Sequence, residues 1–154
     1  MKAWKPAATA IASLTLCASA LAQSTTFKNP GDAIEYRQAA LHVMGHHFGH
    51  LGAMASGKLP FDAKAAQADA ELVAVLAKLP WTAFVDGSDK GDTSAKPEIW
   101  SQPDKFKADA QKLQDAVAKL VEAAKTGRQD AVKAAFSAAG ETCKGCHDEF
   151  RKRH

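Results

Sequence analysis

The sequence lacks the features that would mark most functional classes. Its 154 residues include three cysteines and carry a formal net charge of only +3 at pH 7, which is no electrostatic footprint for nucleic acid. No acid–base pair or nucleophile constellation is visible, so we do not expect an enzyme. The apolar run over residues 7–16 is too short to span a bilayer, and no second run follows it. We therefore expect no membrane partner.

The N-terminal residues have the pattern of a secretory signal peptide. Lys2 and Lys5 precede the apolar run, and an A-x-A cleavage triplet ends at Ala22. We expect residues 1–22 to be removed, which leaves a single domain over residues 23–154. Both lysines are lost with the signal and no acid is, so the net charge falls to +1. The product should be soluble and periplasmic.

The three cysteines divide between the signal segment and the end of the chain. Cys17 follows Leu16, where a lipoprotein cleavage site needs a small residue, so we assign it to the signal. Cys143 and Cys146 are followed at once by His147, which is the C-x-x-C-H signature of c-type haem attachment. Two thiols three residues apart on a helix project to one side and can bond both vinyl groups of one porphyrin. The adjacent imidazole can ligate the iron, so we expect one covalent haem c per chain.

Two other readings of this motif are weaker. A redox dithiol belongs beside a strand and a helix start, and no strand pattern flanks Cys143 and Cys146. A zinc site with His147 and His154 is also conceivable, but structural zinc normally closes a loop between separated ligand pairs. Covalent haem in a bacterium is attached outside the cytoplasm, so the motif and the signal peptide support each other.

Four segments show the apolar spacing of bundle helices. Asn29 and Asp62 are N-cap residues for the first two, and Pro103 opens the third. The expected buried seams are Ile34, Leu41, Met44, Phe48, Leu51 and Ala55 in the first; Ala65, Ala68, Leu72, Val75 and Leu79 in the second; Phe106, Ala110, Leu113, Val117, Leu120 and Ala124 in the third; and Val132, Phe136, Ala139, Cys143, Cys146 and Phe150 in the fourth.

The segment between the second and third helices, residues 80–103, has no helical period. It carries Trp81, Phe84 and Trp100, which suggests that it covers something apolar. Four helices, one long crossover and no strands predict an all-α, antiparallel four-helix bundle. Since the cysteines lie on an inward seam, the haem should lie inside this bundle.

Arg37 occupies a seam position of the first helix. A cation in a core seam is costly unless it meets an anion. Arg37 could extend its charged end into solvent at the end of the bundle. We favour a contact with a haem propionate.

Over its whole mature length the chain resembles the cytochrome c prime family. The resemblance rests on short segments in the first helix, in the crossover and at the C-terminus, which are residues 36–41, residues 79–81, Phe84, residues 97–100, residues 143–147 and Arg151.

The resemblance implies a high-spin, five-coordinate haem with His147 as proximal ligand and Leu41 closing the distal side. It implies binding of nitric oxide and carbon monoxide, little binding of oxygen, and a homodimer built through the first two helices. Electron transfer and nitric oxide handling are both possible roles, and a redox partner is not identified. The residues that it places at or near the haem, besides Cys143, Cys146 and His147, are Arg37, Gln38, Leu41, Trp81, Phe84, Glu98 and Arg151.

A low-spin, six-coordinate electron carrier is the alternative function. Its sixth ligand would come from the first helix, with Met44 as the first candidate and His42 or Met54 behind it. Leu41 cannot ligate iron or donate a hydrogen bond to bound oxygen, so the gas-binding function depends on an open sixth position.

The first helix also carries a histidine stripe. His42, His46 and His50 recur every four residues and, counted from the seam, point away from the haem. Such spacing can bind zinc or copper, but no carboxylate lies within the stripe to orient the rings, so we do not favour a metal site. Gly45 and Gly49 are costly inside a helix, which predicts close packing of this segment against a second copy.

Overall fold

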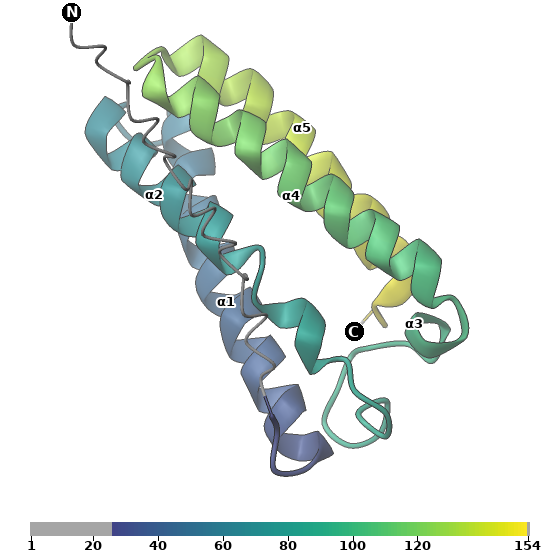
Figure 1. Cartoon of the computed structure of the whole chain (residues 1–154). Helices are drawn as coiled ribbons and strands as arrows, with labels where there is room; N and C mark the ends of the chain where they lie inside the picture. Colours follow the sequence, from purple (N-terminus) through teal and green to yellow (C-terminus); the bar gives the residue numbers. More distant parts are fainter. Residues whose placement is uncertain (1–25, 154) are drawn as a thin grey trace, which may run out of the picture.

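The computed structural model describes residues 26–153. The expected signal peptide, residues 1–22, lies outside the described residues. Two antiparallel pairs of long helices make up the bundle, and two short helical turns interrupt the crossover (Figure 1). The elements are α1 (Pro30–Ala55), α2 (Ala63–Leu76), η1 (Pro80–Ala83), α3 (Glu98–Ser101), α4 (Pro103–Lys125) and α5 (Gln129–Phe150). The predicted four-helix bundle is confirmed, and within residues 26–153 no helix is long and apolar enough to cross a membrane.

Local sequence signals set the helix starts as predicted. The Asn29 side chain accepts a hydrogen bond from the backbone N–H of Asp32 at 3.0 Å, and Pro30 occupies the first turn of α1. Asp62 accepts bonds from the N–H groups of Lys64 and Ala65. These bonds satisfy backbone donors that no helical carbonyl can reach.

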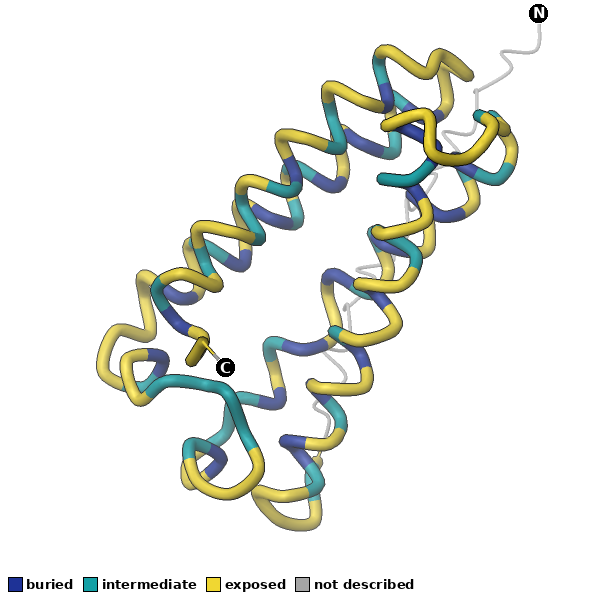
Figure 2. Tube along the Cα trace, turned by 180° about the vertical axis from the view of Figure 1, so that it is seen from behind, coloured by how far each residue is buried: buried dark blue, intermediate teal, exposed yellow. Residues whose placement is uncertain are grey.

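The predicted seams of α4 and α5 face the core. All six expected positions of α4 are buried, and Val132, Ala139 and Phe150 are buried in α5. Helix α1 approaches α5 closely at Gly52, where a Cβ atom would lie 2.6 Å from the ring of Phe136. Figure 2 shows the buried positions of the long helices turned toward the interior and their outer sides exposed.

The predicted seam of α2 is wrong. The helix buries Ala66, Asp69, Ala70 and Val73, whereas Leu72, Val75 and Leu79 are exposed. Small alanines face the core because they let α2 approach its neighbours closely. Leu72 and Val75 therefore lie on the outer side of α2, while Val73 packs into the core.

The crossover and the end of the chain meet at one end of the bundle (Figure 1). Ala95 and Arg151 form an isolated antiparallel bridge. On either side of it, the N–H of Lys96 donates to the carbonyl of Phe150 at 3.0 Å, and the N–H of Lys152 donates to the carbonyl of Ser94 at 2.8 Å. The crossover is thus fastened to the helix that carries the C-x-x-C-H motif.

Candidate haem site

A cavity of about 720 Å³ opens between α1, α4, α5 and the crossover. This volume lies within the range of about 300–1,000 Å³ that is usual for cofactor sites. Apolar side chains make up much of its wall, and two thiols and an imidazole share the α5 side. The main apolar lining residues are Leu41, Met44, Phe48, Val73, Trp81, Phe84, Ile99, Phe106, Leu113, Val117 and Phe150.

The C-x-x-C-H motif lies in the last two turns of α5, and both its cysteines and its histidine line the cavity. Cys143 and Cys146 are half-buried free thiols. Burial raises the pKa of Cys143, and burial followed by the charge of Asp109 raises the pKa of Cys146 to about 11. Both thiols are therefore protonated at neutral pH.

His147 follows on the same helix end. Burial of part of its ring, and then the nearby cation of Arg151, lower the pKa of His147. The imidazole is therefore neutral at pH 7, which is the form that can ligate a metal. Both cysteines lie within a continuous helix rather than at a strand-to-helix turn, so the structure does not support the dithiol reading. The zinc reading needs His154, which lies outside the described residues.

Arg37 is 2% exposed and donates four hydrogen bonds to the crossover side of the cavity. One terminal nitrogen donates to the carbonyl of Ala83 at 2.9 Å and to the hydroxyl of Ser88 at 2.7 Å. The other donates to the carbonyl of Ser88 at 2.6 Å and to the hydroxyl of Thr93 at 2.9 Å. The guanidinium carbon also lies 4.5 Å from the ring centroid of Phe84.

These bonds use four of the five N–H donors of Arg37. Within residues 26–153 its hydrogen-bond partners include no carboxylate. Carbonyl and hydroxyl oxygens and an aromatic face thus satisfy a cation that we expected to need an anion. Contact with a haem propionate stays a prediction, and the Nε–H is the donor left for it.

The other predicted residues divide between the cavity and its outside. Gln38 lines the cavity and donates to the carbonyl of Asp92 at 2.8 Å. Trp81 and Phe84 also line it, and both contact the ring of Phe106, at centroid distances of 5.7 and 4.7 Å. Glu98 is exposed and does not line the cavity. It begins the short helix α3, whose buried residue is Ile99, and Ile99 reaches the cavity instead.

Arg151 lines the cavity from a position just beyond the end of α5. Helix α5 ends at Phe150, and Arg151 has an extended backbone, so it does not share a helix face with His147. Its N–H donates to the carbonyl of His147 at 3.1 Å, and its bridge to Ala95 holds it in place.

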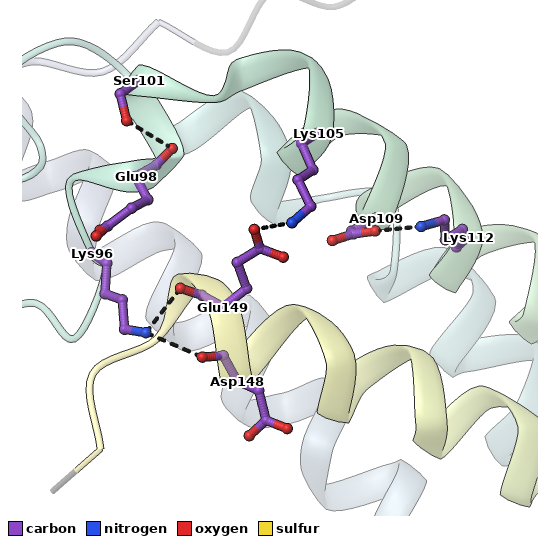
Figure 3. A network of polar contacts seen from close by, with 8 residues as sticks. All are labelled: Lys96, Glu98, Ser101, Lys105, Asp109, Lys112, Asp148 and Glu149. Atoms are coloured by element: carbon purple, nitrogen blue, oxygen red, sulfur yellow. Dashed lines mark hydrogen bonds and ion pairs between the residues drawn. The ribbon is translucent and has the colours of Figure 1, made fainter.

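A polar network supports this end of α5 from the crossover and from α4 (Figure 3). The ammonium of Lys96 donates to the carbonyls of Asp148 and Glu149, at 3.1 and 2.9 Å. Lys105 forms an ion pair with Glu149. A cation at the last carbonyls of a helix is favourable to the helix dipole, so Lys96 helps to fix the helix end that carries His147.

Of the proposed alternative ligands, His42 and Met44 line the cavity. Met54 does not, because it is packed in the bundle core with 2% of its surface exposed. Phe106 and Phe150, which were predicted only as core residues, also line the cavity. So do Asp109, Ile99 and residues 93–95, for which spacing and motifs carry no signal.

Two thiols and a neutral imidazole on one wall of an apolar cavity in a helical bundle are typical of c-type haem proteins. A family profile described as Cytochrome C' matches residues 32–151. The cytochrome c' of Rubrivivax gelatinosus is 53% identical over 128 residues, covering 82% of this chain and 99% of the relative. Its crystal structure superposes with a TM-score of 0.80, covering 82% of this chain and all of that one.

Structures of cytochrome c prime from Alcaligenes xylosoxidans are also similar. A nitric oxide complex of a leucine-to-isoleucine variant matches with 42% identity and a TM-score of 0.78, and covers 83% of this chain and 100% of that one. A carbon monoxide-bound variant of the same protein matches with the same identity, TM-score and coverage. The chain belongs to the cytochrome c' family, as the resemblance of its sequence predicted.

Proposed function

We propose that this chain, after loss of residues 1–22, is a periplasmic haem protein that binds nitric oxide and carbon monoxide at a five-coordinate, high-spin iron. The observation that carries the proposal is the C-x-x-C-H motif lining an apolar cavity to which α1 presents Leu41. The nitric oxide and carbon monoxide complexes of the relatives support the choice of ligands. The same site is also compatible with electron transfer by the haem iron.

The residues present fit a covalent haem c. Each protonated thiol, Cys143 and Cys146, would add across one vinyl group, forming a C–S bond while its proton passes to the other vinyl carbon. No net oxidation or reduction is needed for this addition. The neutral imidazole of His147 would ligate the iron, and the bound haem supplies the metal centre that takes up gases and electrons.

Leu41 would act only sterically, by limiting the space for a ligand on the distal side of the haem. Its side chain has no lone pair for iron and no donor for bound oxygen. A small ligand that depends little on a hydrogen bond, such as nitric oxide or carbon monoxide, is therefore favoured over oxygen. Gln38 and Arg37 would lie near the haem edge, because both line the crossover side of the same cavity.

A low-spin, six-coordinate electron carrier is the second candidate. Met44 is 8% exposed and lines the cavity, so its thioether is available as a sixth ligand. The two candidates place different residues of one helix at the iron, which makes them separable by experiment.

Optical spectra of the purified ferric and ferrous protein, with and without nitric oxide, test the proposal. We expect a high-spin ferric spectrum that is the same in wild type and in Met44→Leu. A low-spin, methionine-ligated spectrum that becomes high-spin in Met44→Leu would overturn the proposal in favour of the alternative. Haem that stays with the denatured chain in wild type, but not in a Cys143→Ser, Cys146→Ser double variant, would verify covalent attachment.

The same proposal includes a homodimer built through α1 and α2. Val43 of α1, Leu72 and Val75 of α2, and Leu79 just beyond the end of α2 are exposed, with Val75 at 57%. Exposed apolar side chains that gather on one pair of helices are typical of a self-association surface. Gly49 lies on the same helix as Val43, and a Cβ placed there would meet no atom within 4 Å in the single chain.

A further inference from the structure

The histidine stripe of α1 does not lie as its spacing predicted. His42 and His46 line the edge of the haem cavity, whereas His50 turns toward α2. There Asp69 contacts two rings: its Oδ1 lies 2.8 Å from Nδ1 of His47, and its Oδ2 lies 2.5 Å from Nδ1 of His50. The orienting carboxylate that the stripe lacks in sequence is thus supplied by the neighbouring helix.

These contacts fix the tautomers of both rings. An ionised carboxylate has only acceptor oxygens, so each Nδ1 must carry the hydrogen. In a neutral imidazole the Nε2 then holds a free lone pair, which is the form that binds metals. Metal-binding histidines almost always donate their other N–H to a carboxylate or carbonyl in this way. The hydrogen bonds that orient metal-binding histidines are therefore already present between Asp69 and the rings of His47 and His50.

We propose that His47 and His50 bind a divalent first-row transition ion of the copper and zinc class through their Nε2 atoms, with Asp69 as the orienting residue. Imidazole nitrogens suit these ions, and among them Cu²⁺ binds most tightly to a given set of nitrogen ligands. The two histidines are three residues apart on one helix face. Their side chains are 30% and 45% exposed, so an ion can reach them.

The site is separate from the haem cavity and incomplete on its own. None of Asp69, His47 and His50 lines that cavity. Across residues 26–153 no three His, Cys, Asp or Glu side chains form a ready metal cluster, so two imidazoles set the affinity and water fills the open positions. The ring of His46 lies edge-on to that of His47, with centroids 5.7 Å apart, and is exposed.

Titration of the ferric holoprotein with Cu²⁺, followed by calorimetry and electron paramagnetic resonance, tests the proposal. We expect saturable binding of one ion per chain, or one per two chains if a second copy fills the open positions, with hyperfine coupling to at least two nitrogens. His47→Gln with His50→Gln should abolish it, while the amides can still donate to Asp69. Asp69→Asn should weaken binding by about 10- to 100-fold.

Glu71→Gln is the matched control for charge. It removes one carboxylate from the same helix, but Glu71 is exposed and pairs with Gln67. We expect it to leave the Cu²⁺ affinity unchanged, and the haem spectrum of each variant reports whether it has folded. Binding that persists in the double glutamine variant, or no saturable binding by the wild type, would overturn the proposal. Equal weakening by Asp69→Asn and Glu71→Gln would show a general charge effect and would refute the orienting role of Asp69.

Discussion

Replacing Arg37 with methionine tests whether this buried cation organises the crossover. Methionine keeps much of the length of the side chain but none of its donors. The carbonyls of Ala83 and Ser88 would each lose the hydrogen bond from Arg37, at a cost of about 1–3 kcal/mol for each buried group. Removing a buried charge offsets part of this loss, because burial disfavours the cation and lowers the pKa of Arg37. We expect a net loss of about 2–4 kcal/mol in the free energy of unfolding.

Urea denaturation of the holoprotein, followed by far-ultraviolet circular dichroism, measures this loss. With a typical urea dependence for a small domain, the midpoint should fall by about 1–2 M. Thr93→Val removes one acceptor of the same guanidinium and should lose about 1–2 kcal/mol. Gln38→Met is the control, since Gln38 makes a single exposed bond to the crossover and should lose less than about 1 kcal/mol.

Arg37→Lys separates a role of shape from a role of charge. Lysine keeps the cation but not the planar fork that reaches Ala83, Ser88 and Thr93 together. If the hydrogen bonds to the crossover account for the stability that Arg37 provides, the lysine variant should be destabilised nearly as much as the methionine variant. A methionine variant no less stable than Gln38→Met would refute the reasoning. A lysine variant with wild-type stability would assign the role to charge alone.

Three further changes test the remaining assignments. Leu41→Ala should raise the association rate of carbon monoxide in flash photolysis, because a residue that acts only by exclusion is removed; an unchanged rate would count against this placement. Gly49→Glu should give monomers in sedimentation with an unaltered haem spectrum, since it places a charge beside the proposed apolar interface; a wild type that is monomeric at tens of micromolar would make the test void and the interface wrong. Arg151→Ala should strengthen the bond between His147 and iron, because the nearby cation that draws electron density away from the imidazole is lost. That change would raise the iron–histidine stretching frequency and favour a six-coordinate nitrosyl, and no change in either would leave Arg151 without a proximal role.

Periodicity predicted the fold and the buried faces of α1, α4 and α5 well, but not that of α2. The seam of α4 was correct at all six positions, because its large apolar residues alternate with charged ones and leave one choice of buried face. In α2 the alanines fall on several sides, and the pattern chose the larger Leu72, Val75 and Leu79, which lie outside. A helix that packs through alanine has an apolar surface on both sides, and spacing alone does not tell which one meets the core.

The site was predictable where chemistry is encoded in adjacent residues. Cys143, Cys146 and His147 form one local motif, so their shared wall follows from helical geometry. Contacts between distant segments had no such signal: the bonds of Arg37 to the crossover, and those of His47 and His50 to Asp69, join residues between 19 and 56 positions apart. Nothing in an aperiodic segment shows which residue of a short turn faces inward, and in α3 it is Ile99 rather than Glu98 that lines the cavity.

The fastening of the crossover to both α1 and the end of α5 has a consequence for how the molecule opens. Its hydrogen bonds link residues from 46 to 59 positions apart, from Arg37 with Ala83 to Lys152 with Thr93. Closing loops of this length costs entropy before any contact is gained, so these bonds should form after the helix pairs have docked. Once formed, they depend on one another, because residues 93–96 bond to Arg37 on one side and to the chain end on the other. Amide hydrogens of the crossover and of the last turn of α5 should therefore exchange with solvent as one cooperative unit, ahead of the paired helices.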